Sequence, residues 1–157
     1  EQWRDEFERE RELAGGGGER ADLFVTRYHP LATTVRLGEG GSFAELVRVL
    51  AAATRVHAPV AISSAVALPD TLIRYFRSSD SPVAEVVVES DARWHARVQA
   101  GDLVTQRIRY IGPDGAALDR VLARQAASVA ISGPVTASGR VELASFLVEQ
   151  SVWVGGR

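Results

Sequence analysis

The stretch of sequence that decides the fold is TTVRLGEGGSFAELVRVLAAAT, residues 33–54. It joins a short run of β-forming residues, Thr33–Leu37, to a glycine turn and then to an amphipathic segment, Ser42–Thr54. The apolar residues of this segment recur at the 3.6-residue spacing of a helix with one buried face: Phe43, Leu46, Val47 and Leu50. Ser42 is a good N-cap residue, and Glu45 stands where a capping box places its acidic partner. The stretch therefore predicts a strand, a tight turn and a helix that packs on the strand.

The same strand-then-helix order recurs along the rest of the chain. The predicted strands are Thr33–Leu37, Pro59–Ser63, Ala84–Glu89, Arg107–Ile111 and Ser128–Ile131. The predicted helices are Ser42–Thr54, Pro69–Arg77, Asp91–Gln99, Ala116–Gln125 and Arg140–Ser151. Near-continuous apolar strands, such as the one containing Val86–Val88, are typical of parallel sheets that are covered on both faces. We predict an α/β, Rossmann-like three-layer domain with a mostly parallel five-stranded sheet.

Residues 1–31 differ in composition from the remainder. Charged residues dominate the segment Trp3–Leu13, which predicts a helix, and the four glycines Gly15–Gly18 end it because they cost too much backbone entropy to remain helical. We therefore expect an N-terminal helix and linker arm over residues 1–31 and the Rossmann-like domain over residues 32–157.

Composition excludes several classes of function. The chain has 157 residues, a net charge of −2, no cysteine and no lysine. Thiolate chemistry, Schiff-base chemistry and a phosphate-binding P-loop lysine are therefore absent from it, and no bulk positive charge favours nucleic acid. Its apolar runs are too short to span a membrane, and its first residues lack the apolar stretch of a secretion signal. The expected location is the cytoplasm.

The glycine turn is the one candidate ligand site in the sequence. In nucleotide-binding Rossmann domains the turn after the first strand approaches a pyrophosphate closely, and the helix that follows offers free N–H groups. The candidate cofactor-binding residues here are Gly38, Gly40, Gly41 and Ser42. Three features count against nucleotide binding: Phe43 stands at the third glycine position, Glu39 would repel a phosphate, and Ser63 and Ser64 stand where a ribose-binding acid is expected.

No other constellation predicts catalysis or metal binding. The three histidines, His29, His57 and His95, lie in separate segments without acidic or cysteine partners at ligand spacing. The strand containing Arg107 and Arg109 alternates arginine with apolar residues, which favours an edge strand with a solvated polar side. We therefore predict no catalytic residue and no metal ligand in this chain.

Two segments carry a resemblance to a known family. Residues 24–31, FVTRYHPL, and residues 139–151, GRVELASFLVEQS, resemble the C-terminal region of bacterial Δ1-pyrroline-5-carboxylate dehydrogenases and of the bifunctional proline utilisation A flavoproteins. In those proteins a similar first segment leads into a Rossmann-like domain, and a similar second segment forms a helix near the end of the chain. Their catalytic cysteine, glutamate base and NAD site lie upstream, in an aldehyde dehydrogenase domain.

The resemblance implies a non-catalytic accessory domain that acts as a lid. Its expected partner is an aldehyde dehydrogenase domain of the same polypeptide or assembly, and self-association stays open. The parent protein is expected to bind NAD, and FAD as well if it is bifunctional, whereas this chain is expected to bind neither. Two alternatives stay open: nucleotide binding through the Gly38–Ser42 turn, and an enzyme of a class that the sequence does not reveal.

Overall fold

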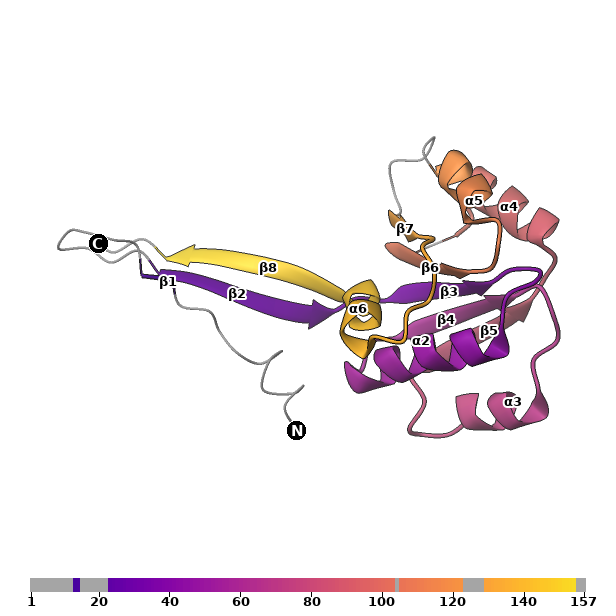
Figure 1. The fold of residues 1–157 in the computed structure, drawn as a ribbon, viewed down its shortest axis with the longest axis horizontal. Helices are drawn as coiled ribbons and strands as arrows, with labels where there is room; N and C mark the ends of the chain where they lie inside the picture. The colour runs from indigo at the N-terminus through magenta and orange to yellow at the C-terminus, as the bar shows by residue number, and fades with distance from the viewer. Residues whose placement is uncertain (1–12, 15–22, 104, 123–128, 155–157) are drawn as a thin grey trace. The chain divides into compact units, whose positions relative to one another are not determined.

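The computed structural model of the chain describes residues 13–14, 23–103, 105–122 and 129–154 (Figure 1). Their contacts divide the chain into two compact units, one of residues 30–146 and one of residues 1–29 together with 147–157. The larger unit is the α/β domain, and the smaller one is built on strands from both ends of the sequence.

The larger unit is organised around a parallel sheet of five strands. In chain order these are β3 (Thr33–Leu37), β4 (Val60–Ser64), β5 (Val83–Val88), β6 (Arg107–Ile111) and β7 (Val129–Ile131). Their order across the sheet is β5-β4-β3-β6-β7, and every adjacent pair is parallel. This confirms the predicted α/β, Rossmann-like fold. The strand order reverses between β3 and β6: the chain builds β3, β4 and β5 outward on one side and then returns to add β6 and β7 on the other side of β3.

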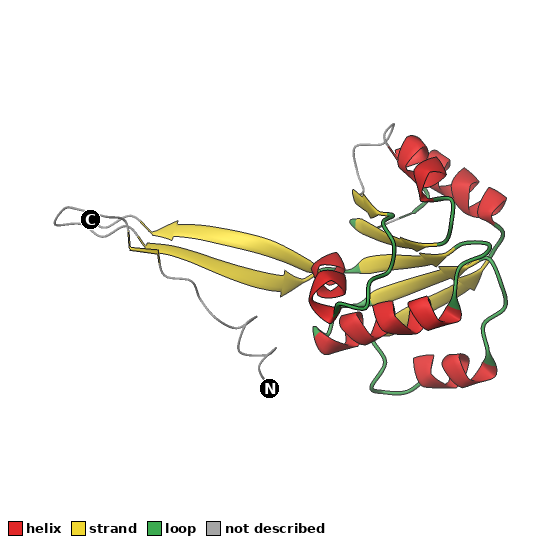
Figure 2. Ribbon diagram, in the orientation of Figure 1, coloured by secondary structure: helices red, strands yellow, loops and turns green. Residues whose placement is uncertain are grey.

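Helices cover both faces of this sheet (Figures 1 and 2). The helices α2 (Phe43–Arg55) and α3 (Asp70–Phe76) lie on one face, and α4 (Asp91–Ala100) and α5 (Gly115–Leu122) lie on the other. The short helix α6 (Gly139–Leu143) packs beside α2 and leads into the 3-10 turn η1 (Ala144–Phe146). Ser42 caps α2 as predicted, because its Oγ accepts a hydrogen bond from the amide of Ala44.

Each face of the sheet has its own buried core. On the α4–α5 face, Ile108 and Tyr110 of β6 pack with residues of both helices: Trp94, Val98, Leu118 and Leu122. On the α2 face the buried helix residues include Leu46, Val49 and Leu50. Phe43 and Val47, which the helical spacing placed on the inner face, are exposed instead, because α2 is rotated so that Val49 and Ala53 face inward.

Strand β6 corrects one prediction. The alternation of arginine and apolar residues favoured an edge strand, but β6 pairs with β3 on one side and β7 on the other. Arg109 is buried there, and its guanidinium forms two hydrogen bonds of 3.0 Å with the Glu142 carboxylate of α6. A charged side chain can occupy a central strand when a buried partner neutralises it.

The smaller unit is a three-stranded sheet of order β1-β2-β8, with β1 at Leu13–Ala14, β2 at Leu23–Pro30 and β8 at Leu147–Val154. The predicted helix Arg140–Ser151 is wrong beyond Leu143, because the chain extends into β8 from Leu147 onward. Side-chain hydrogen bonds join the two long strands, from Tyr28 to Glu149 at 3.0 Å and between His29 and Gln150 at 2.9 Å.

This pairing also changes the assignment of the C-terminal residues. The prediction placed residues 32–157 in one domain, whereas the contacts place residues 147–157 with the N-terminal unit. Most of the predicted helix Trp3–Leu13 and the glycines Gly15–Gly18 lie outside the described residues, and Leu13 itself begins β1. Within the described ranges, the helices are too short and too polar to cross a membrane.

Candidate functional site

The glycine turn between β3 and α2 contains all four predicted site residues. Gly38 donates its amide hydrogen to the Ile111 carbonyl of β6 at 2.9 Å, and Gly41 donates to the Gly38 carbonyl at 3.0 Å. Gly40 has a φ of 78°, a left-handed conformation that glycine adopts without a steric penalty. A Cβ at Gly41 would lie 2.7 Å from the Ile111 carbonyl oxygen, so the turn needs glycine for close packing against β6.

An internal carboxylate occupies the polar side of this turn. Asp91, the first residue of α4, accepts a hydrogen bond from the Glu39 amide at 2.9 Å and one from Arg36 at 2.6 Å. Asp91 is free for this role because the N-cap of α4 is Ser90, whose side chain accepts a hydrogen bond from the Arg93 amide. Burial raises the pKa of Asp91, but the hydrogen bonds from Arg36 and Glu39 and the charge of Arg36 outweigh it, so that the pKa is lowered. Asp91 therefore holds the turn amide as an ionised group.

Arg36 anchors that carboxylate from inside the sheet. Its side chain is fully buried and also donates hydrogen bonds to the Ser63 hydroxyl at 2.7 Å and to the Glu89 carbonyl at 3.1 Å. The guanidinium carbon lies 5.2 Å from the centre of the Trp94 ring, which is the geometry of a cation–π contact. A phosphate at this turn would have to displace Asp91 and would then face Glu39.

The Tyr110 ring fills the space above the turn glycines. A Cβ built at Gly38 would collide with the Tyr110 hydroxyl, and one at Gly112 would lie 2.9 Å from it. Burial raises the pKa of Tyr110, and the negative charge of Asp91 raises it further. The glycines thus accommodate a tyrosine of the same chain at the positions where a Rossmann turn accommodates a ligand.

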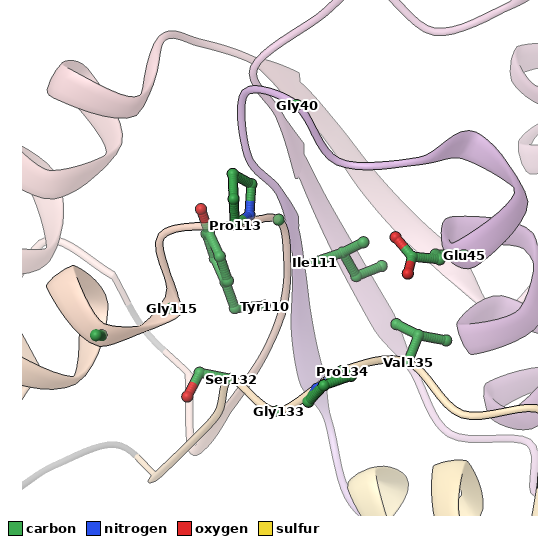
Figure 3. A pocket seen from close by; sticks show the side chains of 12 residues that line it. Gly40, Glu45, Tyr110, Ile111, Pro113, Gly115, Ser132, Gly133, Pro134 and Val135 are labelled. Carbon is green, nitrogen blue, oxygen red and sulfur yellow. The ribbon is translucent and has the colours of Figure 1, made fainter.

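A pocket of about 530 Å³ lies beside the turn, at the carboxyl ends of β3, β6 and β7 (Figure 3). Ligands of doubly wound sheets bind at this place, where the strand order reverses. The pocket is lined by Gly40, Glu45, Tyr110, Ile111, Gly112, Pro113, Gly115, Ala116, Ser132, Gly133, Pro134 and Val135. Of the four residues predicted to bind a cofactor, only Gly40 lines this pocket.

One wall of the pocket, residues 132–135, is fastened by the buried Arg109–Glu142 pair. Arg109 donates hydrogen bonds to the carbonyl of Gly133 at 2.8 Å and to that of Ile131 at 3.3 Å. Glu142 accepts one from the Thr136 amide at 2.8 Å. These bonds fix the backbone on both sides of Pro134, so the wall is held in place before any ligand arrives.

The residues that shape this site could not be singled out from local patterns. Nothing in the local sequence indicates that Asp91 lies against the turn, or that Tyr110 covers Gly38, since each pair is far apart along the chain. One signal was present, because Arg36 and Arg109 each interrupt an apolar strand and a buried arginine needs a partner. The three histidines stay apart, and within the described residues no three His, Asp or Glu side chains gather as metal ligands do.

Comparison with known proteins found no match: no protein-family model matches the chain, and no curated protein or solved structure matches it.

Proposed function

We propose that the chain is a non-catalytic accessory domain of a cytoplasmic, proline-catabolic Δ1-pyrroline-5-carboxylate dehydrogenase, and that it packs on the catalytic aldehyde dehydrogenase domain. In this proposal the catalytic domain oxidises glutamate semialdehyde and holds NAD, and a proline dehydrogenase domain holds FAD if the protein is bifunctional. This chain contributes a covering surface.

The observation that carries the proposal is the exposed apolar surface of the smaller unit. Trp153 of β8 is 58% exposed, and Val148, Val152 and Tyr28 are exposed as well. Because side chains alternate along a strand, Val148 and Val152 lie on one face and Trp153 on the other. A narrow sheet with exposed large apolar groups on both faces is marginally stable alone, and such groups mark interaction surfaces. Trp3, Phe7 and the Phe24 side chain lie outside the described residues.

The interior of the glycine turn supports the same proposal. The Glu39 amide is bonded to Asp91, and Tyr110 covers Gly38, so these groups do not fit the pyrophosphate of a dinucleotide. A Rossmann-like domain whose turn is filled by its own side chains is suited to a structural role.

The test is direct binding between the full chain and the purified Δ1-pyrroline-5-carboxylate dehydrogenase domain of the same organism, measured by sedimentation velocity and calorimetry. We expect a one-to-one complex that Trp153→Ser weakens about tenfold or more, since a buried aromatic anchor contributes about 2 kcal/mol to an interface. Val129→Ser is the matched control, because Val129 is 60% exposed but belongs to the larger unit. Absence of a complex, or equal loss in both variants, would contradict the proposal.

The position of the pocket keeps nucleotide binding through Gly38–Ser42 as a second candidate function. The full chain would be titrated with NAD, NADP, FMN and ATP while its melting temperature is followed. A ligand that binds only the folded state must raise that temperature. No rise at millimolar concentration would end this candidate.

A further inference from the structure

The pocket at the end of the sheet has a feature that neither the accessory role nor the glycine turn explains. Its volume of about 530 Å³ falls within the range of small-molecule sites, which is about 300–1,000 Å³. Only one of its twelve lining residues, Glu45, carries a charge at neutral pH. The chemistry of this carboxylate therefore decides which molecules the pocket favours.

The Glu45 carboxylate has no partner among the residues that the structure describes. The sequence predicts a capping box in which Glu45 accepts a hydrogen bond from the Ser42 amide. In the structure the Ser42 hydroxyl accepts a hydrogen bond from the Ala44 amide. No described residue donates a hydrogen bond to the Glu45 carboxylate or forms an ion pair with it. Figure 3 shows that carboxylate on the pocket side of α2, beside Ile111 and Val135. A half-buried carboxylate is stabilised by a positively charged partner.

The surroundings of Glu45 are apolar and stiff. Ile111 and Val135 flank it, and the prolines Pro113 and Pro134 shape the turns on either side of the pocket. The Arg109–Glu142 pair holds the segment that contains Pro134 and Val135. A site held in this way loses little conformational freedom when a ligand binds, and this favours affinity.

We propose that this pocket binds a small organic cation, whose ammonium or guanidinium group pairs with Glu45 and whose hydrocarbon part packs against Pro134 and Val135. A charged hydrogen bond to the carboxylate supplies the specificity. Phosphates and carboxylates are disfavoured, because Glu45 would repel them and none of the described residues that line the pocket is cationic. The ligand class is therefore opposite in charge to a nucleotide, and the site is independent of the accessory role.

The experiment compares three probes of one shape: n-butylammonium, butanol and butyrate, with agmatine as a longer cation. Each is titrated into the full chain while backbone amide NMR shifts and the melting temperature are followed. We expect saturable binding of the two cations at about millimolar concentrations, with shifts at Gly40, Gly112 and Val135, and a rise in melting temperature. Butanol and butyrate should produce neither effect.

Two variants separate a site from general attraction to an acidic chain. Glu45→Gln keeps the side-chain shape and should raise the dissociation constant of butylammonium about tenfold or more, because it removes a charged hydrogen bond. Glu85→Gln removes the same charge at an exposed residue of β5 and should leave binding unchanged; circular dichroism checks that both variants fold. The proposal is overturned if neither cation binds at about 10 mM, if butyrate, inorganic phosphate or ATP binds as tightly, or if Glu45→Gln binds as the unmodified chain does.

Discussion

Replacing Glu142 by leucine should destabilise the larger unit more than any surface substitution. Glu142 and Arg109 are 3% and 1% exposed and form two hydrogen bonds of 3.0 Å. Removing the carboxylate leaves the guanidinium charge buried, which costs about 3–5 kcal/mol. The Thr136 amide also loses its acceptor at 2.8 Å. We therefore expect Glu142→Leu to lower the free energy of unfolding by about 4 kcal/mol, near the middle of that range.

A double-mutant cycle tests whether the pair causes this loss. Arg109→Met should also be strongly destabilising, because it leaves the Glu142 charge buried and removes donors from the Ile131 and Gly133 carbonyls. The double variant should be more stable than the sum of the single effects predicts by about 2 kcal/mol or more, since neither charge is then left alone. Urea unfolding followed by circular dichroism measures all three, and Glu85→Leu is the exposed control. Single effects that add within about 0.5 kcal/mol would refute the coupling.

Two further substitutions test the glycine turn. Because the pKa of Asp91 is lowered in the folded chain, its stabilisation is present above its ordinary value of 3.8 and is lost as the pH falls through the lower folded value. Asp91→Asn should therefore lower the melting temperature at neutral pH and flatten its fall on acidification; an unchanged acid profile would contradict the ionised state of Asp91. Gly38→Ala should cost about 1–3 kcal/mol by forcing a methyl group into the Tyr110 hydroxyl, and Tyr110→Phe should restore part of that loss in urea unfolding. Gly139→Ala, whose added methyl would meet no neighbour within 4 Å, is its control, and equal stability of the two alanine variants would be the contrary result.

Local periodicity was sufficient to predict the parallel sheet. Each predicted strand is a short β-forming run, and each is followed by a segment with helical spacing or a capping residue, so the five units could be identified one at a time. The segment from Gly139 onward shows where this reasoning fails. Leu143, Phe146 and Leu147 fit a helix, but residues from Leu147 onward pair with β2, more than a hundred residues earlier in the chain. A partner at that distance overrides the local preference.

The candidate site was harder to predict for the same reason. Gly38–Ser42 could be recognised as a turn because glycine spacing is local. The side chain that occupies the turn could not be predicted, since Asp91 lies near Glu39 only because β3, β4 and β5 are adjacent strands of the sheet. Glu45 illustrates the opposite error: its spacing from Ser42 predicted a capping box, but among the described residues the Glu45 carboxylate accepts no hydrogen bond, while the Ser42 hydroxyl accepts one from the Ala44 amide.

The pairing of β2 with β8 makes the smaller unit dependent on the folding of the larger one. Tyr28 and Glu149 are 121 residues apart in sequence. Closing an unstructured loop of that length costs about 4 kcal/mol in chain entropy, more than two exposed strands can offset. Once the larger unit has folded, the Leu31 amide donates to the Phe146 carbonyl at 2.8 Å, so the adjoining ends of β2 and β8 start side by side and the closure is already made. During synthesis β2 must therefore wait for its partner β8 until nearly the whole of this sequence has emerged, and a substitution that unfolds the Rossmann-like sheet also releases the strand that carries Trp153.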